Sequence, residues 1–300
     1  MPTDIEAGTQ ETRARLYDSI VKGVTEKTYK FKQVVLVSPT SAWKNFFYRE
    51  DPSVLTEPAG NAIRGIPRGA NFPVAFASWE LIQKNIEKYG LEVNMPWEDI
   101  ISSDFDLQMR QLIKLGERVA KAVDDQIWID LGGTIDNVGG NSTATTNATQ
   151  SFSVTARPWT SSSANIIDDL MRAKQLLGEN YYPTSDVKVL MNERAHRAVL
   201  KYLVDKGAQF PQIATNAAGG GSVSQLAGFD FIVSNSATAS NALVVVPKRC
   251  ATWKELVSFQ TNTTEDPFRS VRIRAVEEGV LQLTDPLAVV RIMGTEGVEN

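Results

Sequence analysis

The feature that most constrains this fold is a long, unbroken helical pattern between residues 104 and 132. Apolar side chains recur there at spacings of three and four, and charged side chains fill the other faces, which indicates an amphipathic helix with one buried side. Residues 102–104 offer N-caps, and Gly132 and Gly133 offer a C-terminal stop. At 1.5 Å per residue such a helix spans roughly 40 Å. The pattern therefore predicts a helical spine for the fold.

Strand patterns dominate the second half of the chain. Two further amphipathic helices are predicted at 165–178 and 192–205, and a strand pattern at 187–191 lies between them. Beyond residue 226, short apolar runs rich in β-branched residues are bounded by turn residues, which predicts strands. These runs are 229–233, 242–246, 251–259, 271–275, 279–283 and 288–293, and shorter strand patterns occur at 31–37 and 151–155. The elements together predict a mixed α+β fold.

Three stretches lack a core pattern of their own. Residues 1–28 form a polar arm with one short helical pattern, and residues 206–224 form a loop with three consecutive glycines. Between residues 49 and 73, four prolines and three glycines exclude a helix or a central strand, while the apolar flanks predict a long two-stranded excursion. Ordering such segments costs conformational entropy unless another chain covers them. We therefore expect self-association.

The composition excludes several classes of chemistry. The chain has one cysteine and one histidine, so it cannot form an internal disulfide, a Cys/His zinc site or a Cys-x-x-Cys redox pair. The net charge of -4 and the pI near 5.3 disfavour a generic nucleic-acid-binding surface. The longest apolar runs are far shorter than the roughly 20 residues that cross a bilayer. We expect no metal, no cofactor and no membrane span.

The residues with catalytic potential do not stand in recognisable motifs. His196 lies in a predicted helix with no serine or cysteine in a nucleophile context, and Cys250 is expected to be a small core residue. The glycines at 219–221 are not followed by the Gly-Lys-Ser/Thr of a phosphate-binding loop. We therefore predict that the protein is not an enzyme.

Two pairs of adjacent carboxylates also have a plain interpretation. Asp124 and Asp125 are neighbours on the long helix, where side chains point about 100° apart, and Glu277 and Glu278 are neighbours in a strand region, where they face opposite sides. Neither pair presents two carboxylates to one substrate. We predict that these residues are solvated charges or salt-bridge partners.

Three local sequences occur in the order found in a known family. Residues 115–127 read LGERVAKAVDDQI, residues 226–234 read LAGFDFIVS, and VRIRA at 271–275 is followed by DPLAVV at 285–290. In these segments and their order, the chain resembles the major capsid proteins of tailed bacteriophages, whose fold is named after phage Hong Kong 97. The resemblance extends over nearly the whole chain and implies that fold.

The resemblance also implies how the chain is divided. The N-arm would comprise residues 1–42, the E-loop residues 46–80, and the first part of the P-domain residues 81–163, with the spine helix at 104–132. The A-domain would comprise residues 164–247, with residues 206–224 as its loop at the capsomer axis, and residues 248–300 would form the closing P-domain strands.

By the same resemblance, the chain is expected to be a major capsid protein that forms pentamers and hexamers and closes into an icosahedral head around double-stranded DNA. The expected partners are further copies of the chain, a separate scaffolding protein, a portal and a decoration protein. The expected location is the virion, after assembly in the host cytoplasm. The covalent cross-linking of the founding phage uses a lysine in the E-loop and is not expected, because no lysine occurs between Lys44 and Lys84.

In that family each E-loop lies over a neighbouring subunit, so the charged residues of the excursion are candidates for contacts between subunits. They crowd a segment with almost no core of its own, where charge-assisted hydrogen bonds to another chain would supply the missing interactions. The candidates are Arg49, Glu50, Asp51, Glu57, Arg64 and Arg68.

Two alternatives stay open on the sequence alone. An encapsulin-type nanocompartment shell resembles the same fold but packages a cargo enzyme, so particles that contain DNA would separate the two. A cytoplasmic α/β enzyme of unknown activity would form a small oligomer, whereas a capsid protein forms megadalton particles or capsomers.

Overall fold

The computed structural model describes residues 28–50, 68–71, 79–96, 105–132, 150–206, 225–266 and 269–296, and the single residues 23 and 98. The chain divides into two compact units, each built from separate parts of the sequence. The first comprises residues 1–45, 85–129 and 252–281, and the second comprises residues 46–84, 130–251 and 282–300. The helix predicted within residues 1–28, the tip of the excursion and the loop predicted at 206–224 lie almost entirely outside the described residues.

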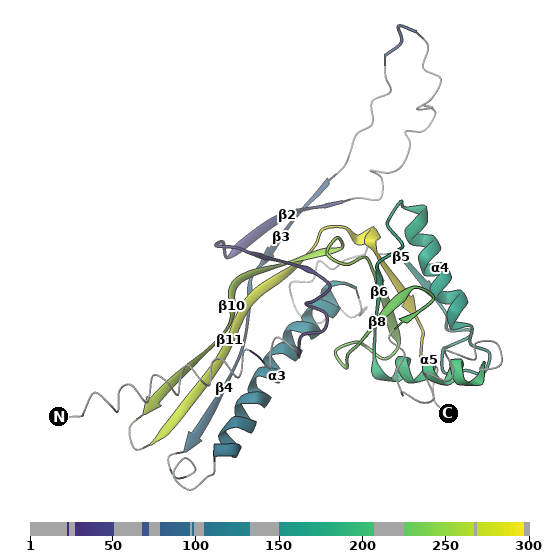
Figure 1. The fold of residues 1–300 in the computed structure, drawn as a ribbon. Coiled ribbons are helices and arrows are strands. Elements are labelled where there is room, and N and C mark those ends of the chain that lie inside the picture. The colour runs from purple at the N-terminus through teal and green to yellow at the C-terminus, as the bar shows by residue number, and fades with distance from the viewer. Residues whose placement is uncertain are drawn as a thin grey trace. The chain divides into compact units, whose positions relative to one another are not determined.

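A four-stranded sheet and one long helix form the first unit. The strand order is β1 (Leu36–Pro39), β10 (Ala251–Asp266), β11 (Ser270–Leu283) and β4 (Glu87–Pro96). Strand β1 is parallel to β10, and β4 is antiparallel to β11. The helix α3 (Phe105–Asp130) runs along one face of this sheet (Figure 1). The predicted spine helix is therefore confirmed, with its ends within two residues of the prediction.

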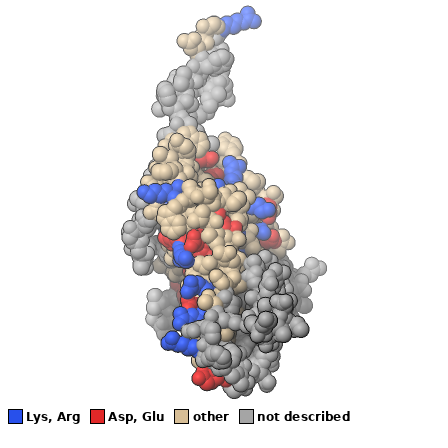
Figure 2. Space-filling view, turned by 90° about the vertical axis from the view of Figure 1, so that its left-hand side faces the viewer, with Lys and Arg blue, Asp and Glu red and all other residues tan. Residues whose placement is uncertain are grey.

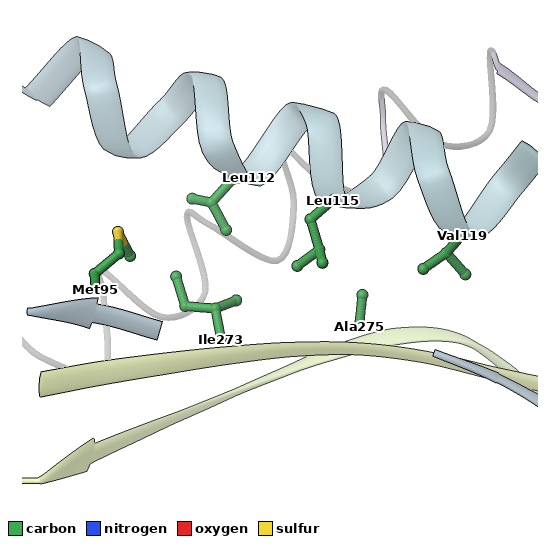
Figure 3. Packing of buried hydrophobic residues seen from close by; sticks show 6 residues of the cluster. All are labelled: Met95, Leu112, Leu115, Val119, Ile273 and Ala275. Atoms are coloured by element: carbon green, nitrogen blue, oxygen red, sulfur yellow. The ribbon is translucent and has the colours of Figure 1, made fainter. Parts of the chain in front are cut away.

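The core of this unit forms where the helical period of α3 meets the two-residue period of the strands. Side chains of α3, β4 and β11 point toward one another in Figure 3, and these are Met95, Leu112, Leu115, Val119, Ile273 and Ala275. The intervening Arg272 and Arg274 are exposed on the other side of β11. Arg274 there forms an ion pair of 2.6 Å with Glu92 of β4. The alternation predicted for residues 271–275 is thus confirmed.

One strand prediction in this unit is wrong, and two others are confirmed as parts of one longer strand. Residues 271–275 and 279–283 belong to the single strand β11. The strand predicted at 31–37 begins at Leu36 and includes Pro39, while the residues before it form a turn. Phe31, Val34 and Val35 are buried in that turn, so their apolar character reflects packing of a turn rather than a strand.

A six-stranded sheet organises the second unit. Its order is β5 (Gln150–Ser153), β12 (Val289–Met293), β9 (Asn241–Val245), β6 (Val187–Met191), β8 (Phe229–Val233) and β7 (Gln225–Leu226). The pairs β12–β9, β9–β6 and β8–β7 are antiparallel, whereas β12–β5 and β6–β8 are parallel. All five residues of β9 are buried, so this sheet is covered on both faces at its centre.

Two helices predicted from the sequence lie against the six-stranded sheet (Figure 1): α4 (Ile166–Glu179) and α5 (Glu193–Asp205). Asn192 caps α5 because its side chain accepts a hydrogen bond from the backbone N–H of Arg194. The buried residues of α4 follow the helical spacing on which the prediction rested, as Ile166, Leu170, Ala173 and Leu177 show.

Two strands of the six-stranded sheet come from stretches that the resemblance would assign to the P-domain. Strand β5 lies within residues 81–163 and β12 within residues 248–300, both expected in the P-domain. Both strands instead join the sheet that contains β6, β8 and β9. The reason is long-range pairing of β12 with β9 and β5, which no local pattern records.

Candidate subunit interface

The base of the predicted excursion is a two-stranded sheet of β2 (Lys44–Glu50) and β3 (Trp79–Asn85). The expectation that the apolar flanks pair is confirmed for these described residues. Phe47 points inward and is 8% exposed, whereas its neighbours Phe46 and Tyr48 are 61% and 62% exposed. On β3, Trp79 and Leu81 are 50% and 56% exposed. We call Phe46, Tyr48, Trp79 and Leu81 the β2–β3 apolar surface.

The β2–β3 apolar surface is energetically costly in an isolated subunit. Fully burying one such side chain contributes about 1.5–3 kcal/mol, and clustered exposed apolar residues mark interaction sites. On the face of the molecule drawn in Figure 2, acidic and basic side chains are interspersed with uncharged ones among the described residues. The apolar character of β2 and β3 is therefore the clearest sign of a contact surface near the excursion.

The structure places three of the six charged contact candidates. Arg49 and Glu50 are half-buried in β2, and Arg68 is exposed in a turn. Asp51, Glu57 and Arg64 lie outside the described residues. The charged candidates are therefore not brought together in the described part, and their contacts with adjacent chains stay a prediction. The charged residues were the predicted contacts here, and the exposed apolar residues were not predicted, although the aromatic density of β2 is a visible signal.

Glu50 lies beside a polar cluster of its own chain. Its backbone N–H donates a hydrogen bond of 2.9 Å to the carbonyl of Thr284. Burial raises the pKa of Glu50, the negative charge of Asp285 raises it further, and Arg249 lowers it. Asp285 in turn accepts hydrogen bonds from Tyr182 Oη at 2.5 Å and from Arg249 Nε at 3.3 Å. These contacts hold the end of β2 on its own subunit.

Asp124 anchors the turn that precedes β1. Its carboxylate is 2% exposed and accepts backbone N–H bonds from Lys30 at 2.7 Å, Phe31 at 3.1 Å and Lys32 at 3.2 Å. Phe31 stacks on Trp128, which is one helical turn further along α3, with ring centroids 5.6 Å apart. Burial raises the pKa of Asp124 to about 6, although the three hydrogen bonds act to lower it. The turn is thus held to α3 by polar and aromatic contacts together.

Lys32 extends this anchor to the sheet. Its ammonium group lies 2.6 Å from Glu277 of β11 and 2.9 Å from Glu255 of β10. Tyr29 donates a hydrogen bond to Glu277, and burial together with the Glu277 charge raises the pKa of Tyr29. Because Glu277 is fully buried, the lysine and tyrosine provide the partners that a buried carboxylate requires.

The carboxylate predictions are thereby resolved. Glu277 and Glu278 face opposite sides of β11, and Glu278 pairs with Lys88 at 3.3 Å, so the salt-bridge interpretation is confirmed for both. For Asp124 the prediction is wrong, because this residue is buried, binds backbone N–H groups and forms no salt bridge with a residue that the structure describes. Asp124 lies one helical turn before Trp128, so the two side chains share a side of α3, and the apolar Trp128 could have indicated from the sequence that this side is buried.

The remaining reactive residues are not assembled into a site. Cys250 is fully buried, as predicted, and burial raises the pKa of its thiol to about 12. His196 is half-buried on α5. Among the residues that the structure describes, no group of three or more His, Cys, Asp or Glu side chains could hold a metal ion. The glycines at 219–221 lie outside the described residues.

The sequence and the fold both match known capsid proteins. Residues 81–292 match the family model of phage capsid proteins, which covers more than half of the chain. The chain belongs to the phage capsid protein family. No curated protein sequence matches it.

Solved capsid structures share the fold at low sequence identity. The capsid of cyanophage P-SCSP1u aligns with a TM-score of 0.63 and 14% identity, over 88% of this chain and 87% of that chain. The phage G structure of major capsid and decoration proteins aligns with a TM-score of 0.63 and 11% identity, over 90% of each chain. A virus-like particle from Pyrococcus furiosus aligns with a TM-score of 0.58 and 12% identity, over 93% of this chain and 99% of that chain. The mixed α and β architecture is therefore that of phage capsid structures.

These findings confirm the resemblance to phage capsid proteins and define the class of this chain as a structural protein of a virion capsid. None of the helices in the described part is long and apolar enough to cross a membrane.

Proposed function

We propose that this chain is the major capsid protein of a tailed bacteriophage, and that it forms the pentamers and hexamers of an icosahedral head enclosing double-stranded DNA. The observation that carries the proposal is the β2–β3 apolar surface, which stands at the base of the excursion and is uncovered in the isolated chain. A neighbouring subunit that buries these side chains would supply the stabilisation that the single chain lacks.

The parts of the capsid fold follow from this proposal. Strands β2 and β3 support an E-loop at 46–80, and α3 supports the spine helix at 104–132. The P-domain would comprise residues 81–163 and 248–300, and the A-domain residues 164–247, which include α4, β6, α5, β8 and β9. Arg49, Glu50, Asp51, Glu57, Arg64 and Arg68 would then lie at the polar rim of the contact made by the β2–β3 apolar surface.

Assembly of variant subunits tests the proposal. Phe46→Ser combined with Trp79→Ser should lower the yield of particles at least about tenfold. The two lost apolar contacts together contribute more than about 1.4 kcal/mol to subunit association, and that free energy corresponds to a factor of ten. Met171→Ser combined with Val204→Ser is the matched control, since these side chains of the same unit are 47% and 50% exposed. Negative-stain micrographs and sedimentation report the yield. Equal assembly of both variants and the wild type would contradict the proposed interface.

The content of the particles tests the enclosed partner. Particles from infected cells should contain nuclease-protected double-stranded DNA, whereas an encapsulin-type shell would contain a cargo protein. A separate scaffolding protein, a portal and a decoration protein complete the proposed set of partners. The phage G capsid structure, which shares this fold, includes decoration proteins.

A further inference from the structure

The exposed side of α3 carries a row of cations. Arg110, Lys114, Arg118 and Lys121 are all exposed, and their spacings of four, four and three residues place them on one side of the helix. The opposite side of α3 packs into the core through Leu112, Leu115 and Val119. We call these four cations the basic row of α3.

The described residues around the basic row do not neutralise it. Its members make no ion pair with any residue that the structure describes, and Glu117 is the one carboxylate within residues 110–121. Asp125 follows one turn after Lys121 and is half-buried, while Asp124 is engaged by the turn at residues 30–32. The excess of positive charge is local, because the chain as a whole has a net charge of -4.

The dimensions of the row suit a nucleic acid backbone. The eleven helical steps from Arg110 to Lys121 span about 16 Å, and B-DNA presents one phosphate per about 3.4 Å along each strand. The row therefore faces the length of about five phosphates of one strand with four cations, roughly one per helical turn. Arginine forks bind phosphate oxygens in pairs and lysine acts as a point charge, so no base needs to be read.

A second cationic cluster in the other unit is a weaker candidate. Arg194, Arg197 and Lys201 of α5 line a cavity of about 270 Å³ with Glu296. Arg194 already pairs with Glu296 at 2.8 Å, and Glu193 and Asp205 stand on the same helix. Three carboxylates thus accompany three cations, and this cluster supplies a control.

We propose that the basic row of α3 contacts the phosphate backbone of the enclosed DNA, independently of sequence. The inference rests on the proposed function, in which the shell contains double-stranded DNA. Glu117 limits the affinity, so the contact orients DNA along the helix without holding it in place. A shell made of such an acidic chain then has one defined DNA-facing element per subunit.

The test measures binding of a 30-base-pair duplex to full-length unassembled subunits by fluorescence anisotropy at several salt concentrations. Three to four phosphate contacts give a slope of log K against log[salt] of about -3. Lys114→Ala combined with Lys121→Ala should make this slope shallower by about two and lower the affinity at least about tenfold at low salt. Glu117→Gln should raise the affinity several-fold. The control Arg197→Ala with Lys201→Ala should leave the slope unchanged.

Each other outcome overturns the inference. An unchanged slope in the α3 variant, an equal change in the α5 control, or no duplex binding by the wild type at low salt would each exclude the basic row as the specific contact. Impaired subunit association with unchanged DNA binding would assign the row to a second copy of the chain instead. Failure of the inference leaves the proposed function intact if particles still contain DNA, and failure of the proposed function shows as an absence of such particles.

Discussion

The four-stranded and the six-stranded sheet of this protein bury their residues in different ways. Between Arg272 and Gly279 in β11 of the four-stranded sheet, buried residues alternate with exposed or half-buried ones, because α3 covers one face there. In β9 of the six-stranded sheet, every residue is buried. One residue in two is therefore buried in that part of β11, whereas every residue of β9 is buried. Free sheet surface for partners is accordingly expected on the first.

The largest expected effect is in β9, where adjacent residues should both be sensitive. Leu243→Ala should lower the free energy of unfolding by about 2–5 kcal/mol, and Val244→Ala by somewhat less, because each removes methyl groups from a fully buried position. Urea unfolding of the unassembled subunit measures both. If one of the two substitutions lowers the free energy of unfolding by less than about 0.5 kcal/mol, one face of β9 is not packed, and the difference in burial between the two sheets is contradicted.

The next effect is a pH dependence centred on Asp124 of the first unit. Its pKa is raised from 3.8 to about 6, so its contribution to stability is fully present below pH 3.8 and is lost as the pH rises through about 6. At 1.36 kcal/mol per pH unit, the wild type should gain up to about 3 kcal/mol relative to Asp124→Asn as the pH falls from 7 to 4.

Thermal unfolding across this pH range measures the effect in wild type and variant. The companion variant is Asp125→Asn, the next residue on α3, which removes a negative charge that helps to raise the pKa of Asp124 and should therefore keep the pH dependence but move it slightly to lower pH. A difference between wild type and Asp124→Asn that does not vary with pH would contradict the raised pKa.

A smaller effect is expected where β11 meets a large side chain. A Cβ added at Gly279 would lie 2.6 Å from the indole ring of Trp253, which is fully buried. Gly279→Ala should therefore destabilise the subunit by about 1–3 kcal/mol through overpacking. Gly178→Ala is the control, because its nearest neighbour is a methyl group 4.0 Å away and alanine favours the helix. Denaturant unfolding that shows equal stability for both variants would mean that Trp253 moves freely.

The smallest effect is expected on the exposed face of β11. The Arg274–Glu92 pair has side chains 63% and 35% exposed, so Arg274→Ala should change the free energy of unfolding by less than about 1 kcal/mol. Ile273→Ala, one residue away, should cost about 2–5 kcal/mol because it opens a cavity against α3. Equal costs in urea unfolding would show that this sheet is covered on both faces, as β9 is.

Helices were the most predictable part of the fold. The predictions at 104–132, 165–178 and 192–205 correspond to α3, α4 and α5 within two residues at each end. Strands were less predictable, because a buried turn such as the one around Phe31 has the same apolar composition as a strand. Strand β4 carries charged residues and Gly90 and has no clear local signal, since its pairing with β11 defines it.

The candidate interface was predicted in position but not in chemistry. The proline and glycine content between residues 49 and 73 indicated an excursion, and its charged residues were the natural candidates. The exposure of Phe46 and Trp79 could not be predicted, because an apolar side chain is normally assigned to the core. The burial of Asp124 likewise depends on a turn more than 90 residues away in the sequence.

The sequence by itself determined the elements whose stability is local. Helical period, capping residues and the alternation at 271–275 depend on neighbours a few residues apart, and these sufficed to indicate α3, the strand-rich end and a capsid-like order of parts. The tertiary structure alone decided which strands share a sheet, which apolar residues stay exposed and which carboxylates are buried. Those outcomes depend on contacts between residues far apart in the chain, whose energies no local pattern contains.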